Sequence, residues 1–128
     1  MSFLLLLFLS LGQQPDSSER QLIAIDSLYA ARDTSALVRS LRAWDGESIP
    51  RIQLYRGITA LWTGRTTQAI SILRPLLDSA KTALTNDQRR EAIRALAESY
   101  ARKRQYANAA GLYDAELKSV DAQLDSLS

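Results

Sequence analysis

The 128-residue sequence contains no cysteine and no histidine. Without cysteine the chain has no disulfide and no thiolate nucleophile. Without histidine it lacks the imidazole that the common catalytic triads and many metal sites require. These absences exclude Cys/His metal sites and most enzyme mechanisms. We therefore expect a non-catalytic protein with no metal and no cofactor.

The chain also has little excess charge of either sign. It carries 16 basic and 14 acidic residues, for a net charge of +2, and 46% of its residues are apolar. Such a balance provides no extended cationic field, so we expect no nucleic-acid partner. The length suits one packed domain better than two.

A short apolar run, FLLLLFLSL, occupies residues 3–11. It is far shorter than the roughly 20 residues that span a bilayer as a helix. Its length fits the core of a signal peptide, and Ser10 and Gly12 supply the small residues of a cleavage site. We predict a signal peptide at 1–12, a linker at 13–17 and a helical domain at 18–128. The protein would then be exported, periplasmic or extracellular, with no membrane anchor after cleavage; the alternative is a buried or interfacial N-terminal helix.

Small residues recur in pairs along the remaining chain. The two members of each pair are twelve residues apart, and a break in helical pattern lies between them. Two antiparallel helices joined by a tight turn approach closely where side chains are small, which offsets the poor helix propensity of glycine. The pattern predicts three helical hairpins, offset by 33 and 40 residues. The predicted helix-packing pairs are Ala24 and Ala36, Gly57 and Ala69, and Ala97 and Ala109.

Capping signals divide the chain into six helices. Gly64 is a predicted C-cap, Ser48 a predicted N-cap with Pro50 in the first turn, and TNDQ at 85–88 has the form of a capping box. Pro75 falls inside a predicted helix and should bend it. The remaining predicted N-caps are Asp33, Thr34 or Ser35, and Thr66 or Thr67.

The third hairpin resembles a tetratricopeptide repeat (TPR) in the order and spacing of Leu96, Ala97, Tyr100, Ala109 and Tyr113. The second keeps Gly57, Ala69 and Leu73, but has Arg56 and Ala60 where the family has leucine and tyrosine; the first keeps Ile23, Ala24 and Ala36, but has Ser27 and Ser40. The resemblance covers roughly residues 17–120. It implies an all-α fold, a right-handed α–α superhelix of three antiparallel hairpins plus an extended or capping C-terminal helix.

In the TPR family, peptides commonly lie in a concave groove lined by the first helix of each hairpin. The resemblance therefore implies a groove with Gln21 and Ile25 at one end and with a peptide-binding set comprising Tyr29, Leu54, Ile58, Trp62, Arg94, Glu98 and Arg102. An alternative is that Leu54 and Ile58 pack between repeats and that the charged residues form solvated pairs. The lysine and asparagine clamp that the family uses for a C-terminal carboxylate is not present.

The leading hypothesis is an exported TPR-like scaffold that binds a protein or peptide. Asp45 and Glu47 lie in a turn-rich linker and are interpreted as capping or solvated residues, not as an acid–base pair. One alternative function is the N-terminal domain of a longer secreted enzyme such as a hydrolase. Another is homo-oligomerisation through the apolar stripe of Leu117, Val120, Leu124 and Leu127.

The packing hypothesis makes a direct prediction at Gly57. A Gly57→Leu substitution should overpack the hairpin and lower the free energy of unfolding by about 1–3 kcal/mol or more. Thermal unfolding followed by circular dichroism measures the change. A variant that melts at the wild-type temperature would show that Gly57 is not a point of close helix approach.

Overall fold

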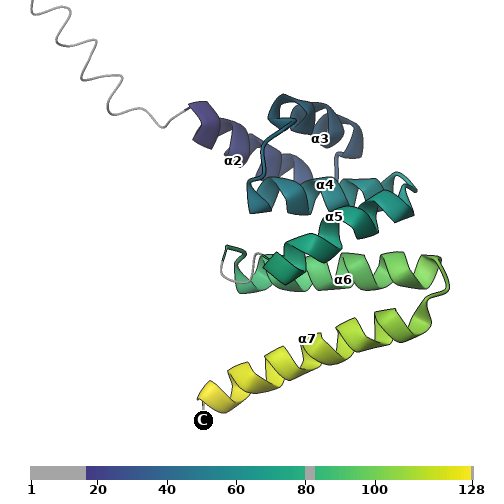
Figure 1. Cartoon of the computed structure of the whole chain (residues 1–128). Coiled ribbons are helices and arrows are strands. Elements are labelled where there is room, and N and C mark those ends of the chain that lie inside the picture. The colour runs from purple at the N-terminus through teal and green to yellow at the C-terminus, as the bar shows by residue number, and fades with distance from the viewer. Residues whose placement is uncertain (1–16, 80–82, 128) are drawn as a thin grey trace, which may run out of the picture. The chain divides into compact units, whose positions relative to one another are not determined.

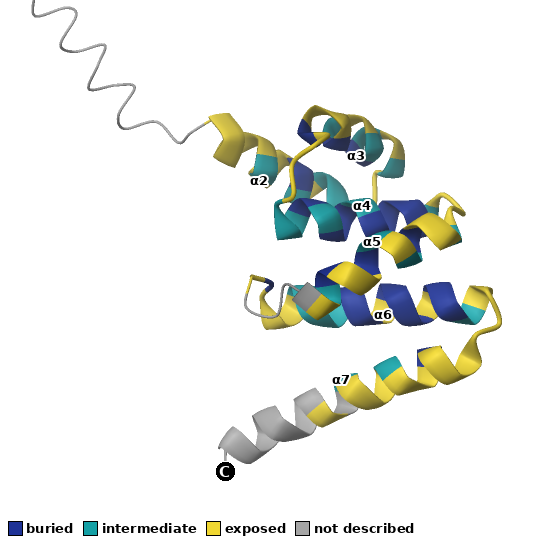
Figure 2. Cartoon of the chain, in the orientation of Figure 1, coloured by how far each residue is buried: buried dark blue, intermediate teal, exposed yellow. Residues whose placement is uncertain are grey.

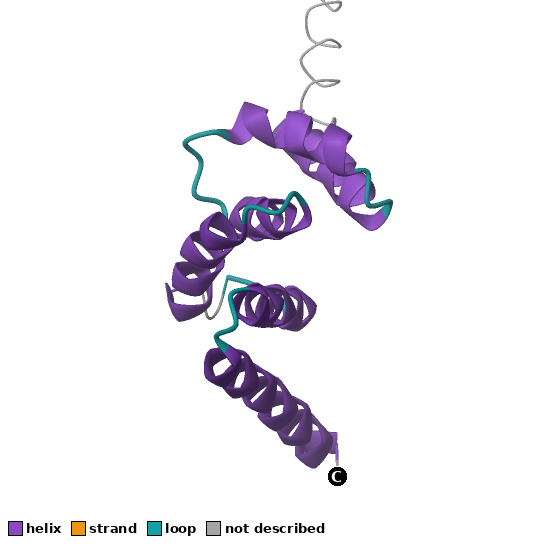
Figure 3. Ribbon diagram, turned by 90° about the vertical axis from the view of Figure 1, so that its right-hand side faces the viewer, coloured by secondary structure: helices purple, strands orange, loops and turns teal. Residues whose placement is uncertain are grey.

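A computed structural model describes residues 17–79 and 83–127, and every regular element in these ranges is helical (Figures 1 and 3). The predicted all-α class is therefore confirmed for the described ranges, where no helix has the length and apolar character needed to cross a membrane. The predicted signal peptide lies outside them. The elements are α2 (Ser17–Ala30), α3 (Thr34–Leu41), the 3₁₀-helix η1 (Arg42–Trp44), α4 (Pro50–Trp62), α5 (Thr66–Ser79), α6 (Asn86–Arg102) and α7 (Tyr106–Leu127).

The chain divides into two compact units at a boundary inside α3, between Leu37 and Val38. The expected domain at 18–128 thus contains residues of both units. In the first unit, Ile25 of α2 and Leu37 of α3 are buried. The second unit contains η1 and α4 to α7, and it holds most of the buried apolar residues (Figure 2).

Helix α6 is central to the second unit, because it packs against α4, α5 and α7, while α4 also packs against α5. Polar contacts reinforce this arrangement at the C-terminal end of α6. Arg102 Nη1 donates to the carbonyl of Leu61 at 3.0 Å, and Lys103 Nζ donates to Thr67 Oγ1 at 2.5 Å. Fully buried aliphatic side chains fill the interior between the helices, among them Ile52, Leu54, Leu61, Leu73 and Leu96.

The turns after α2, α4 and α6 have the same geometry. Each contains a residue with positive φ: Arg32 (54°), Gly64 (81°) and Arg104 (60°). In each turn this residue donates its N–H to the carbonyl three positions back, and the next residue donates to the carbonyl five positions back. This pair of bonds is the Schellman motif, which satisfies the last carbonyls of a helix. Gly64 is thus confirmed as the residue that terminates α4.

These turns correct the predicted register of the first hairpin. Two positions can be compared between the hairpins: seven residues before the positive-φ residue and five residues after it. They hold Gly57 and Ala69 around Gly64, and Ala97 and Ala109 around Arg104, and all four residues are buried. In the first hairpin the same positions are Ile25 and Leu37, whereas Ala24 is exposed and Ala36 is half-buried. The first and second hairpins are therefore offset by 32 residues, not by 33. The geometry of the turns sets this register, and the small side chains do not. The predicted pair of Ala24 and Ala36 is therefore one position away from the positions that match the other two hairpins.

Gly57 marks a close approach between α4 and α5. A Cβ built at Gly57 would lie 2.5 Å from Cγ and from Cδ2 of Leu73, far inside van der Waals contact. Leu73, and not Ala69 as expected, therefore fills the space above the glycine. Ala69 is itself fully buried one helical turn earlier on α5.

The helix starts agree only in part with the predicted caps. The capping box before α6 is confirmed, because Thr85 Oγ1 accepts from the Gln88 N–H at 3.1 Å and Gln88 Oε1 accepts from the Thr85 N–H at 3.0 Å. Asp33 caps α3 by accepting from the N–H of Ala36 at 3.3 Å.

Two other predicted N-caps are wrong. Ile49, not Ser48, precedes α4 and makes no side-chain cap, although Pro50 does lie in the first turn. Helix α5 begins at Thr66, so the threonines at 66 and 67 lie inside it. Pro75 lies within α5, which continues to Ser79, and α7 is the extended final helix that the sequence predicts, with 22 residues.

The contact between Gly57 and Leu73 predicts opposite effects for one substitution at two glycines. Gly57→Ala should destabilise the chain, because the clash, about 1–3 kcal/mol, exceeds the helix-propensity gain of about 1 kcal/mol. Gly111→Ala in α7, where an added Cβ meets nothing within 4 Å, should stabilise it. In a Leu73→Ala background Gly57→Ala should also become stabilising. Urea unfolding of the wild type and of the four variants measures these free energies. An equal loss from Gly57→Ala in both backgrounds would contradict the contact.

Candidate functional site

Two apolar residues of the groove implied by the TPR resemblance, Leu54 and Ile58, are not available to a partner. Leu54 and Ile58 have only 0% and 3% of their surface exposed, so both belong to the core of the second unit. Trp62 is half-buried at the end of α4, and Tyr29 is half-buried in the other unit. The structure thus favours the alternative interpretation, in which Leu54 and Ile58 pack between helices.

The charged part of that groove makes contacts within the chain. Arg94 of α6 forms an ion pair with Glu116 of α7 at 3.1 Å. Glu98 pairs with Arg102 one turn later on α6, also at 3.1 Å, and Arg102 in addition holds the end of α4. Arg94 and Arg102 therefore connect α6 to its neighbouring helices, whereas Glu98 pairs within α6.

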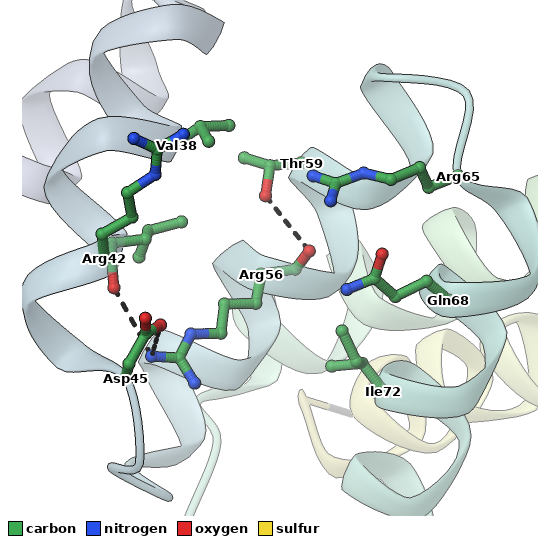
Figure 4. A pocket seen from close by; sticks show the side chains of 9 residues that line it. Val38, Arg42, Asp45, Arg56, Thr59, Arg65, Gln68 and Ile72 are labelled. Atoms are coloured by element: carbon green, nitrogen blue, oxygen red, sulfur yellow. Dashed lines mark hydrogen bonds and ion pairs between the residues drawn. The ribbon is translucent and has the colours of Figure 1, made fainter.

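A different site lies between α3–η1, α4 and α5, where a pocket of about 260 Å³ opens to solvent (Figure 4). All of its residues belong to the second unit. Three arginines and one aspartate give it a strongly polar lining. The lining residues are Val38, Leu41, Arg42, Asp45, Arg56, Thr59, Arg65, Gln68 and Ile72.

The 3₁₀ geometry of η1 places two charged residues of this lining together. Side chains three positions apart eclipse in a 3₁₀-helix. Leu41 and Trp44 are therefore on one side and are buried, whereas Arg42 and Asp45 share the other side and are exposed. The backbone N–H of Asp45 donates to the Arg42 carbonyl at 3.2 Å, which closes the turn.

Helix α4 contributes Arg56 and Thr59, which are one turn apart. The Arg56 side chain is only 20% exposed, and its Nη2 donates to Asp45 Oδ1 at 3.3 Å and to the Leu41 carbonyl at 3.4 Å. Thr59 is buried, and its hydroxyl donates to the Arg56 carbonyl at 3.1 Å. Arg56 is therefore the least exposed arginine of the pocket and forms its inner wall.

The opposite wall comes from the turn before α5 and from α5 itself. The Schellman turn at Gly64 leads directly to Arg65, and Gln68 and Ile72 follow at helical spacing on the same face. The Arg65 Nε donates to Thr63 Oγ1 at 3.2 Å, and its two Nη atoms extend beyond that contact. In Figure 4, Arg65 and Gln68 reach toward the hollow from the side opposite to Arg42.

Several guanidinium donors around the pocket have no acceptor within the described ranges. The Arg42 side chain makes no hydrogen bond or ion pair there, and Arg56 and Arg65 each use one of their nitrogens. Asp45 is the single acidic residue of the lining. The arrangement can therefore bind an anionic group through guanidinium hydrogen bonds.

Sequence reasoning missed this pocket, although one signal for it was visible. Arg56 interrupts an otherwise buried run of α4 and replaces the leucine of the TPR pattern. The partners of its side chain are the Leu41 carbonyl at the end of α3 and Asp45 just after η1, and only the fold brings these segments to α4. Among the described residues no cluster of three or more His, Cys, Asp or Glu could hold a metal ion.

No protein-family model matches the chain, and the searches of curated proteins and of solved structures returned no match either.

The geometry of the Arg56–Asp45 pair predicts a small effect on stability. The Asp45 side chain is 79% exposed, so solvent screens the pair. Asp45→Asn should change the free energy of unfolding by less than about 1 kcal/mol. Urea unfolding of the variant beside the wild type measures it. A loss of several kcal/mol would show that the pair holds η1 in place.

Proposed function

We propose that this protein is an exported, TPR-like helical scaffold that binds a partner protein and catalyses no reaction itself. The observation that supports the proposal best is the repeated hairpin turn. Three turns share one hydrogen-bond pattern, and the residues at matching positions around them are buried. Repeated hairpins that stack on one another are the basis of solenoid proteins, which present extended surfaces to partners.

The packing of the second unit agrees with a stack of this kind. Helix α6 contacts both helices of the preceding hairpin, α4 and α5, and also its own hairpin partner, α7. Within the second unit, the α4–α5 and α6–α7 hairpins therefore pack against each other, as neighbouring members of a repeat array do. A right-handed superhelix of three hairpins is the architecture that we propose on this basis.

The proposed docking surface differs from the groove that the resemblance implies. Leu54 and Ile58 are in the core, and the arginines of α6 are engaged in contacts between helices. The arginine-lined pocket between α3–η1, α4 and α5 instead presents guanidinium donors that have no acceptor within the described residues. The stripe proposed for homo-oligomerisation, from Leu117 to Leu127, consists of side chains outside the described part of the structure.

The scaffold proposal predicts a stoichiometric complex that depends on the folded stack. The purified protein should capture a reproducible partner from a periplasmic or extracellular extract, and that partner, once identified and purified, should bind it with a fixed ratio in isothermal titration calorimetry. Leu73→Asp, which places a charge in the core, should abolish binding, because the docking surface needs packed hairpins. The matched surface variant Gly111→Ala should bind normally.

Two results would contradict the scaffold. One is that no purified candidate forms a complex of fixed ratio. The other is that analytical ultracentrifugation shows self-association alone, which would instead support the oligomerisation module.

A further inference from the structure

We propose that the pocket between α3–η1, α4 and α5 binds the carboxylate of an aspartate or glutamate side chain of the partner protein, with Arg42 and Arg65 as its ligands and Asp45 as an internal competitor. The inference rests on the proposed scaffold function and specifies the chemistry of its partner. It concerns the face lined chiefly by the second helices of the hairpins, whereas the TPR resemblance implies the face lined by the first helices.

The charges of the pocket favour an anion. Arg42, Arg56 and Arg65 bring three positive charges to a lining with a single carboxylate, that of Asp45. Arg42 and Arg65 are exposed and come from opposite sides of the pocket (Figure 4). Two guanidinium groups on opposite sides can each donate to one carboxylate, and such charge-assisted hydrogen bonds are stronger than neutral ones.

Asp45 already pairs its own carboxylate with one arginine of the pocket. Its Oδ1 lies 3.3 Å from Arg56 Nη2, but most of its side chain remains in solvent. An exposed pair of this kind is weak, so an incoming carboxylate can replace it. Asp45 should therefore weaken the affinity of the site for a second carboxylate, because it occupies Arg56 and adds a negative charge.

The size and the walls of the pocket favour an amino-acid side chain over a larger ligand. About 260 Å³ is below the usual range of pockets for cofactors and drug-sized molecules. Val38, Leu41 and Ile72 form apolar parts of the wall, which suit the methylene stem of an acidic side chain. Nucleic acid is disfavoured, because a net charge of +2 provides no extended basic track for a phosphate backbone.

The experiment uses a blocked peptide, acetyl-Ala-Ala-Glu-Ala-Ala-amide, whose one carboxylate is the glutamate side chain. It is titrated into ¹⁵N-labelled protein, and the arginine Nε–Hε signals are followed by NMR. The signals of Arg42, Arg56 and Arg65 should shift with the glutamate peptide and not with the matched glutamine peptide. Because each lost charge-assisted bond is screened at this open site, Arg42→Gln and Arg65→Gln should each weaken binding by about fivefold.

The opposite response of Asp45→Asn is the most specific part of the test. It should strengthen binding by about threefold, because it releases Arg56 and removes the competing charge. Arg104→Gln, on the α6–α7 turn and outside the pocket, removes the same charge as the pocket variants and should change affinity less than twofold. Circular dichroism checks that every variant keeps its helical content.

Three outcomes would overturn the inference: equal shifts with the glutamine peptide, equal weakening by Arg104→Gln, or no gain from Asp45→Asn. If the protein binds a phosphoserine version of the peptide but not the glutamate peptide, the pocket would be assigned to a phosphorylated partner instead. Failure here would leave the scaffold proposal intact if the purified partner still binds. A peptide response with no partner complex would support the pocket and contradict the scaffold.

Discussion

The contact between Gly57 and Leu73 determines how closely α4 and α5 approach, and the candidate site depends on that separation. Gly57 has no side chain, so the Leu73 side chain lies directly over its backbone. The residues that precede these two, Arg56 and Ile72, both line the pocket. The same contact that closes the hairpin therefore brings the two walls of the pocket together.

The turns and the short 3₁₀-helix then supply the charged groups. The positive φ at Gly64 terminates α4 with the two hydrogen bonds of the Schellman motif. The next residue, Arg65, then lies at the rim of the pocket. The 3₁₀ spacing of η1 puts Arg42 and Asp45 on one side while Trp44 anchors the other side in the core. The backbone of these elements therefore fixes where the three arginine side chains begin, and hydrogen bonds further hold the side chains of Arg56 and Arg65.

The comparison of hairpins shows that a pattern of small residues predicts the presence of a repeat well. It predicts the register of the two helices in each hairpin less well. Ala97 and Ala109 follow the pattern, and both are buried. In the first hairpin the large residues Ile25 and Leu37 occupy the matching positions, so the alanines beside them led to an offset that is wrong by one. Small size permits a close approach but does not enforce it, whereas the hydrogen bonds of the turn leave only one alignment.

The amino-acid sequence by itself determined the helical class, the hairpin breaks, the Gly64 terminus and the capping box at Thr85, because these depend on residues within one or two turns of each other. Only the tertiary structure decided that Leu54 and Ile58 are buried and that Arg42, Arg56 and Arg65 surround one pocket. Side chains from three separate segments meet there. The distances between these side chains depend on how the helices pack. A local pattern of residues does not determine that packing.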